Sequence, residues 1–196
     1  MKKTEIVFAT NNLHKLKEVQ QAVGNKIILL SLKDINFKGE IPETQDTIEG
    51  NSKQKVEYIF ERYNIPCFAD DTGLIIDSLN GEPGVYSARY AGEACSFKDN
   101  CDKVLRNLAK KKDRKARFKT VISFMDQHGI KTFEGVVEGT ILEEYKGSDG
   151  FGYDPIFKPV GYNETFAEMT TELKNEISHR GLAVKKLLLF LESYLP

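Results

Sequence analysis

The adjacent carboxylates Asp70 and Asp71 interrupt an apolar stretch of the chain. Residues 65–69 precede them and suit a buried strand, while Thr72-Gly73 is expected to turn the chain into a second apolar run at 74–76. Successive side chains of a strand point to opposite faces, so the two carboxylates are not both expected to point into the core. A buried carboxylate is costly unless a metal, a base or a helix end uses it. The pair is therefore either a polar turn between strands or part of a functional site.

The N-terminal region has the pattern of an anion-binding site. Residues 5–10 read as a buried strand, and apolar residues recur at helical spacing after Asn12, which is a plausible N-cap. The free N–H groups and the dipole of a helix N-terminus both favour an anion. Lys15 lies in that first turn, where it is either a solvated surface lysine or a partner of a bound anion. The chain contains no Gly-x-x-x-x-Gly-Lys motif, which excludes a Walker-type phosphate loop.

A second amphipathic helix is predicted to start near Asp46 or Thr47. Asn51 and Lys55 are four residues apart, so they share one face of that helix, away from its apolar stripe. Taken alone, this placement favours solvated surface residues over a binding site.

A segment rich in glycine and aromatic residues lies at 146–155. Its glycines would let the backbone approach a ligand, Phe151 is expected to be exposed for stacking, and Asp154 would accept hydrogen bonds from ring N–H groups. These features suit a purine pocket, whereas the glycine spacing does not fit a dinucleotide-binding fingerprint. Further on, Ser178 is expected to cap a final helix, which would place His179 and Arg180 at a second helix N-terminus.

The remaining elements provide the scaffold. Ser96 and Asp99 can cap a helix with Phe97 and Cys101 on its core face, and residues 117–141 form a predicted long hairpin that turns at 127–129. At 196 residues the chain is expected to be a single domain, 1–196, or two lobes sharing one core, with the hairpin central to the second lobe.

Composition limits the classes of partner. The chain has 28 basic and 29 acidic residues and a net charge of −1, which gives no support for nucleic-acid or membrane binding. Its 3 cysteines contain no Cys-x-x-Cys, which argues against a disulfide framework or a zinc site and favours a cytoplasmic protein. Mg²⁺ prefers one or two carboxylates together with waters and phosphate oxygens, a ligand set that Glu43 and Asp71 could supply. Together these features suggest an enzyme that holds a polyphosphate through Mg²⁺ and stacks a base.

Five segments in order resemble the inosine triphosphate pyrophosphatases, the non-standard purine nucleoside triphosphate pyrophosphatases also called XTP/dITP diphosphatases. They cover nearly the whole chain: 9–15, 69–74, 83–90, 150–155 and 178–181. The resemblance implies an α/β fold, an elongated mixed β-sheet with flanking helices forming two lobes around a central cleft. It also implies a homodimer and Mg²⁺-dependent hydrolysis of ITP, dITP or XTP to the monophosphate and pyrophosphate, which would remove deaminated purines from the nucleotide pool.

The resemblance also implies roles for individual residues. Asp71 would be the catalytic base, and Glu43 and Asp71 would hold Mg²⁺. The residues implied to contact the substrate are Thr10, Asn11, Asn12, Leu13, His14, Lys15, Lys55, Thr72, Phe151, Gly152, Tyr153, Asp154, Lys174, His179 and Arg180. Within this set, Phe151 would stack on the base, His179 and Arg180 would read its 6-oxo group, and the lysines would bind the phosphates.

Several alternatives remain open from the sequence. Asp70 could replace Asp71 as the base, since adjacent carboxylates titrate as a pair. Thr72 stands where the family usually has serine. Residues 171–174 are a variant of a run that is more acidic in the family, so the role of Lys174 is the least secure part of the resemblance. A Maf-type pyrophosphatase acting on pyrimidine or modified nucleotides is the nearest rival, and a non-catalytic nucleotide sensor is the second.

Overall fold

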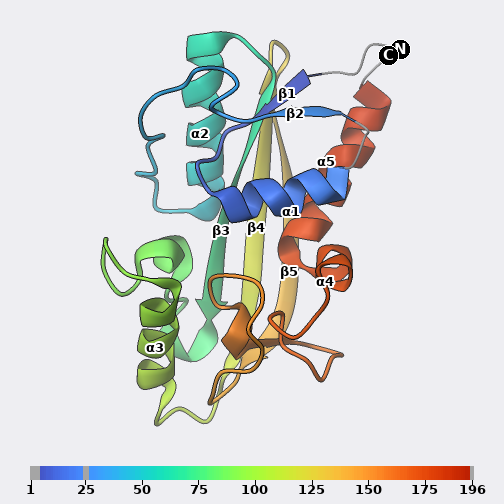
Figure 1. The fold of residues 1–196 in the computed structure, drawn as a ribbon. Coiled ribbons are helices and arrows are strands. Elements are labelled where there is room, and N and C mark those ends of the chain that lie inside the picture. Colours follow the sequence, from blue (N-terminus) through green and yellow to red (C-terminus); the bar gives the residue numbers. More distant parts are fainter. Residues whose placement is uncertain (1–4, 24–26, 195–196) are drawn as a thin grey trace. The chain divides into compact units, whose positions relative to one another are not determined.

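The computed structural model describes residues 5–23 and 27–194 (Figure 1). Its strands are β1 (Glu5–Phe8), β2 (Ile28–Leu30), β3 (Cys67–Ile76), β4 (Lys115–Asp126), β5 (Gly129–Ile141) and β6 (Phe157–Pro159). Its helices are α1 (Leu13–Val23), α2 (Ile48–Tyr63), α3 (Phe97–Leu108), α4 (Thr171–Ile177) and α5 (His179–Tyr194). Within these residues, no helix is both long enough and apolar enough to cross a membrane.

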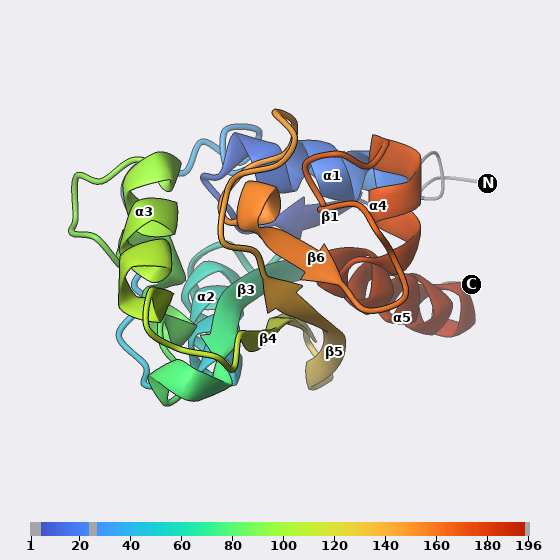
Figure 2. The same cartoon turned by 90° about the horizontal axis from the view of Figure 1, so that it is seen from below.

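The strands form one six-stranded sheet in the order β2-β1-β3-β4-β5-β6. β1 pairs in parallel with both β2 and β3, whereas β6 pairs antiparallel with β5 and lies next to it in Figure 2. The predicted α/β class with a mixed sheet and flanking helices is therefore confirmed. The predicted hairpin is also present, because β4 ends at Asp126 and β5 begins at Gly129 after a two-residue turn.

The chain divides into two compact units. The first unit contains residues 1–71, 120–135 and 180–196, and the second contains residues 72–119 and 136–179. The boundary falls inside β3, directly after Asp71, and inside β4 and β5. The hairpin therefore contributes to both units, and its turn belongs to the first.

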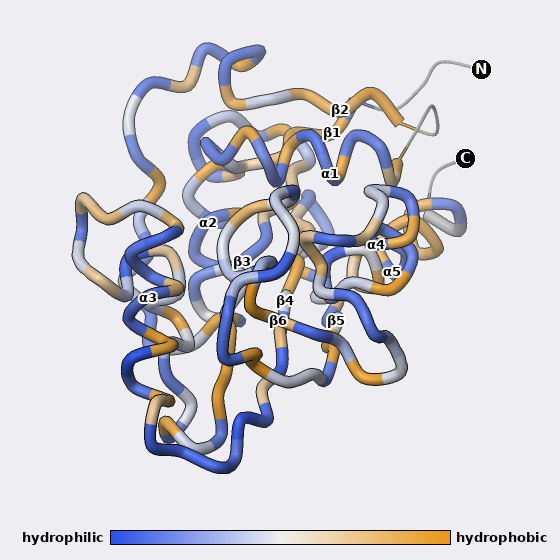
Figure 3. Tube along the Cα trace, turned by 60° about the horizontal axis from the view of Figure 1, so that its bottom comes forward, coloured by the Kyte–Doolittle hydropathy of each residue, from blue (hydrophilic) through white to orange (hydrophobic). Residues whose placement is uncertain are grey.

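In the first unit the sheet is covered on both faces. α1 and α5, which lie next to each other in Figures 1 and 2, share a core with the side chains on one face. The strand residues in that core include Ile6, Phe8, Phe68, Ile122 and Phe124. Their alternating neighbours pack under α2, and these include Val7, Ala9, Cys67 and Ala69. β1 and the start of β3 are buried on both sides, so they read as continuous apolar runs, and Figure 3 shows β1 as predominantly hydrophobic.

In the second unit α3 packs on the later part of β3 and the start of β4. Cys101, Val104 and Leu108 of α3 share a core with Leu74 and Ile76. The predicted capping box is present, since the Ser96 hydroxyl accepts from the Asp99 N–H at 3.2 Å while the Asp99 carboxylate accepts from the Ser96 N–H at 2.8 Å. The start of α3 is thus fixed locally.

Candidate active site

The two adjacent carboxylates lie in the middle of β3. Thr72-Gly73 does not form a turn, so the predicted break between two strands is wrong: the strand continues through Asp70 and Asp71 to Ile76. The two side chains do point to opposite faces. However, both are buried, at 1% and 7% exposure, because helices cover both faces of the sheet here. The expectation that the two carboxylates would not both be buried is therefore wrong, since each enters the core on its own face of β3.

Asp70 shares the orientation of Phe68 and faces α1 and α5. Its carboxylate lies 3.1 Å from Lys15 Nζ of α1 and 3.2 Å from Arg180 Nε of α5. Arg180 also forms an ion pair with Glu18 of α1. Burial alone would raise the pKa of Asp70, but the two cations hold that pKa well below its usual range. Asp70 therefore links two helices to the strand through buried ion pairs.

Asp71 shares the orientation of Ala69 and faces α2. Its carboxylate accepts from Asn51 Nδ2 at 3.3 Å and lies 3.4 Å from Lys55 Nζ. Asn51 and Lys55 are only 1% and 4% exposed, so the preference for solvated surface residues is wrong. Burial raises the pKa of Asp71 above its usual range, although Lys55 and Lys15 oppose the rise. A carboxylate with a raised pKa is better suited than Asp70 to accept and release a proton.

Glu43 joins the group around Asp71 through Lys55. Its carboxylate lies 2.6 Å from Lys55 Nζ, so one ammonium group contacts both carboxylates that were predicted to hold a metal. The pKa of Lys55 is raised above its usual value. Desolvation by burial acts to lower it, but the negative charges of Asp71 and Glu43 have the larger combined effect. The described residues contain no group of three or more His, Cys, Asp or Glu side chains arranged around a common metal position. Two carboxylates fit Mg²⁺, which completes its shell with water and phosphate oxygens.

The segment from Thr10 to Lys15 is shaped by Asn12. The Asn12 side-chain oxygen accepts from the N–H groups of His14 and Lys15, at 3.0 and 3.2 Å, and the Thr10 hydroxyl accepts from the Asn12 N–H at 3.1 Å. The predicted N-cap is thus confirmed. The same segment exposes Asn11 and Leu13, and Leu13 is 70% exposed.

The predicted base pocket is a tight loop in the second unit. Gly150 and Gly152 have φ angles of +75° and +64°, which L-residues with side chains rarely adopt. Between them, the Phe151 N–H donates to the Asp154 carboxylate at 2.7 Å. A Cβ atom on Gly150 would clash with that carboxylate, so the glycine is required there. The phenol of Tyr153 donates to the Ser87 carbonyl at 2.8 Å and so anchors the loop to the short helical segment Gly84–Arg89.

Three other predicted substrate contacts belong to the second unit. Lys174 is only 6% exposed, and its ammonium lies 2.7 Å from Asp154 and 5.0 Å from the centre of the Phe151 ring. The ring of His179 stacks on Phe118 at a centroid distance of 4.4 Å. Thr72 is partly buried in β3. Lys174 therefore takes part in holding the loop, and its contact with phosphate stays a prediction.

In the first unit the predicted site residues form two groups on opposite faces of β3: Lys15 and Arg180 around Asp70, and Lys55 and Glu43 around Asp71. Sequence reasoning missed Glu18, although it lies on α1 three residues after Lys15 and so on the same face. It placed Phe97 and Cys101 together on the core face of α3 but missed that both contact the loop around Phe151. Their spacing of four residues puts them on one face of α3, but no local signal links that face to a loop more than 50 positions away.

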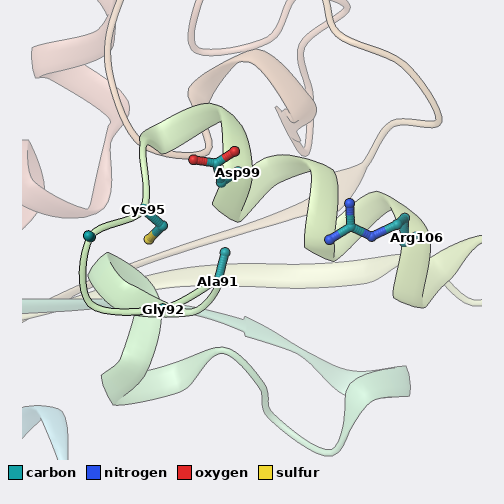
Figure 4. Close-up of a pocket in the computed structure, with 6 residues that line it drawn as sticks. Ala91, Gly92, Cys95, Asp99 and Arg106 are labelled. Atoms are coloured by element: carbon teal, nitrogen blue, oxygen red, sulfur yellow. The ribbon is translucent and has the colours of Figure 1, made fainter.

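A separate pocket of about 480 Å³ lies in the second unit (Figure 4). It is lined by Ala91, Gly92, Ala94, Cys95, Asp99 and Arg106. Asp99 and Arg106 project from α3, and Cys95 lies on the loop that precedes the helix. None of these residues belongs to the predicted site, and Asp99 is already used in the capping box.

Comparison with known proteins identifies the family of the chain. A model of the Ham1 family matches residues 6–190. The dITP/XTP pyrophosphatase of Flavobacterium johnsoniae is 51% identical over 184 residues, which cover 94% of this chain and 96% of the relative. The corresponding protein of Porphyromonas gingivalis is 50% identical over 188 residues, covering 95% and 97% of the two chains. The solved structure of the Staphylococcus aureus Ham1 protein superposes with a TM-score of 0.89 at 38% identity, covering 97% of this chain and all of that one. The chain therefore belongs to the Ham1 family.

Proposed function

We propose that the chain hydrolyses dITP, ITP and XTP to the nucleoside monophosphate and pyrophosphate. The observation that carries the proposal is that the adjacent carboxylates of Asp70 and Asp71 have different partners on the two faces of β3. One carboxylate is held between two cations, while its neighbour lies beside Lys55, which also contacts Glu43. The substrate class is supported by the relatives from Flavobacterium johnsoniae and Porphyromonas gingivalis, which are dITP/XTP pyrophosphatases.

In this proposal Asp71 accepts the proton of the attacking water. The water oxygen forms a bond to the α-phosphorus, the bond from that phosphorus to the α–β bridging oxygen breaks, and pyrophosphate leaves. Lys15 and Lys55 offset the charge on the triphosphate, and the segment from Thr10 to Lys15 surrounds it. Glu43 and Asp71 would hold Mg²⁺, which when bound supplies charge neutralisation on the phosphate oxygens.

Base recognition is assigned to the second unit and to the start of α5. Phe151 stacks on the purine, and Gly152, Tyr153 and Asp154 shape the loop around it. His179 and Arg180 supply donors to the 6-oxo group. Hypoxanthine and xanthine have an acceptor at C6 and a donor at N1, whereas adenine has the reverse. A pocket built for the first pattern leaves the groups of adenine unpaired and can discriminate by roughly 10⁴.

The cellular setting belongs to the same proposal. Cys67, Cys95 and Cys101 are all free thiols, which suits a reducing cytoplasm. The enzyme would act there as a homodimer that clears deaminated purines before polymerases use them.

The proposal is tested by measuring pyrophosphate release from ITP, XTP, dITP, GTP, ATP and dTTP, with Mg²⁺ and with EDTA. Strong release from the first three, lost in EDTA, is the expected result. Preference for dTTP would favour a Maf-type pyrophosphatase. Binding of nucleotide with no pyrophosphate from any of the six would favour a sensor.

Lys55 gives a further test of the same site. Replacing it with methionine removes the ammonium that contacts Glu43 and Asp71, and we expect kcat/KM for dITP to fall about 10²- to 10³-fold. Lys53→Met is the matched control, because Lys53 lies on the same helix, is half exposed and pairs across one turn with Glu49. Steady-state kinetics on the two variants makes the comparison. Equal activities would remove Lys55 from the site.

A further inference from the structure

Phe97 is an exposed aromatic residue that contacts the predicted base-stacking ring. It is the first residue of α3, it is 42% exposed, and its ring lies 5.9 Å from that of Phe151 between centroids, at an interplanar angle of 50°. The distance and tilt are those of a direct aromatic pair. The capping box of Ser96 and Asp99 fixes the first turn of α3 and therefore the position from which Phe97 extends.

The geometry excludes Phe97 as the opposite wall of a base sandwich. A purine between two rings needs parallel planes about 7 Å apart, which is twice the contact distance between carbon atoms. Two rings at 5.9 Å with a 50° tilt leave no such gap. Phe97 therefore supports the Phe151 ring from one side and leaves stacking to Phe151 alone.

A second contact from α3 holds the same loop. Cys101 lies one helical turn after Phe97, and its thiol donates to the Gly152 carbonyl at 3.3 Å. Burial raises the pKa of Cys101 to about 12, so the thiol keeps the proton that it donates. A third contact comes from Lys174, whose Nζ lies 5.0 Å from the Phe151 centroid and is fixed by Asp154. Phe151 is thus held by Phe97 and Lys174, and its neighbour by Cys101.

We propose that Phe97 is a positioning residue for the purine base: it fixes the plane of the Phe151 ring before the nucleotide binds. The inference rests on the proposed role of Phe151 and extends it to a residue on another element. A ring that is already ordered loses less conformational freedom on binding. Phe97 therefore strengthens binding of the base and leaves binding of the phosphates unchanged.

The test compares two ligands that separate base from phosphate. In calorimetry with Mg²⁺, Phe97→Ala is expected to weaken binding of dIMP about three- to tenfold and to leave binding of inorganic pyrophosphate within about twofold of wild type. Phe97→Tyr keeps the ring and is expected to restore dIMP binding. Tyr162→Ala is the control, since Tyr162 is another aromatic of the second unit, 36% exposed, on the segment after β6. Thermal melts verify that each variant is folded.

A double-mutant cycle decides whether Phe97 acts through Phe151. In a Phe151→Ala background, removing Phe97 is expected to have no further effect on dIMP binding. The inference is overturned if Phe97→Ala weakens pyrophosphate binding equally, if its effect on dIMP binding is unchanged in the Phe151→Ala background, or if Tyr162→Ala weakens dIMP binding as much. The readout is binding and not turnover, so a failure to release pyrophosphate from any substrate would refute the proposed function without deciding the role of Phe97.

Discussion

Replacing Asp71 with asparagine is expected to reduce kcat for dITP by about 10³-fold or more while leaving the fold intact. The change removes the proposed proton acceptor, a role worth about 10²- to 10⁴-fold, and weakens one of the two carboxylate ligands proposed for Mg²⁺. Asparagine keeps the shape of the side chain and can still accept a hydrogen bond from Asn51. Lys55 retains Glu43 as a partner at 2.6 Å, so no buried ammonium is left alone.

Pyrophosphate release and urea unfolding on the same protein check this prediction. Asp77→Asn is the matched control, because Asp77 is half exposed and pairs with Arg117 at the surface. The control is expected to keep wild-type kcat. Full activity in Asp71→Asn would exclude Asp71 as the base.

Replacing Asp70 with asparagine is expected to have the opposite profile, with its largest effect on stability. The carboxylate is fully buried between Lys15 and Arg180, and its loss leaves both cations without their shared partner. Breaking a buried ion pair from one side costs about 3–5 kcal/mol. We expect about 3 kcal/mol, because Arg180 keeps Glu18 and the Lys15 side chain is 15% exposed. For a chain of this size that corresponds to a fall in Tm of roughly 6–12 °C.

Urea unfolding of Asp70→Asn measures this loss, with Asp102→Asn as the control. Asp102 pairs with Lys98 across one turn of α3 at the surface, and asparagine can still accept the hydrogen bond from the Tyr145 hydroxyl, so the change in the free energy of unfolding is expected to be less than about 1 kcal/mol. If Asp70→Asn instead kept wild-type stability and lost all turnover, Asp70 and not Asp71 would be the base.

The local features of the fold could be predicted from the sequence. Thr47 and Ser96 cap their helices through contacts to residues three positions away, and Asn12 binds the first amides of α1. The hairpin turn at 127–128 is also local. In each case the residues that determine the structure are neighbours in sequence, so propensity and spacing suffice.

The surroundings of the carboxylate pair could not be predicted in the same way. Alternation along a strand predicts opposite faces for Asp70 and Asp71, but not that helices from three distant parts of the chain cover both faces. Asn51 and Lys55 lie off the apolar stripe of α2, and they are buried because Asp71 compensates them. Residues 70–73 look like a turn in the sequence, but they continue β3, because the charged partners of the two carboxylates come from α1, α2 and α5.

The loop around Phe151 illustrates the same limit. Its glycines and aromatic residues predicted a tight loop that could take a base, and the positive φ angles agree. The pairing of Lys174 with Asp154 joins residues 20 positions apart, so spacing could not reveal it. Phe97 and Cys101 contact the loop although they lie far from it in the sequence, and Cys101 and Gly152 are 51 positions apart. Local spacing could therefore not predict these contacts.

The most direct test of the central claim is hydrolysis of dITP in water enriched in ¹⁸O, followed by mass spectrometry of both products. Attack on the α-phosphorus predicts one ¹⁸O atom in dIMP and none in pyrophosphate. Label in pyrophosphate, or release of labelled orthophosphate, would place the attack at another phosphorus atom and contradict the account.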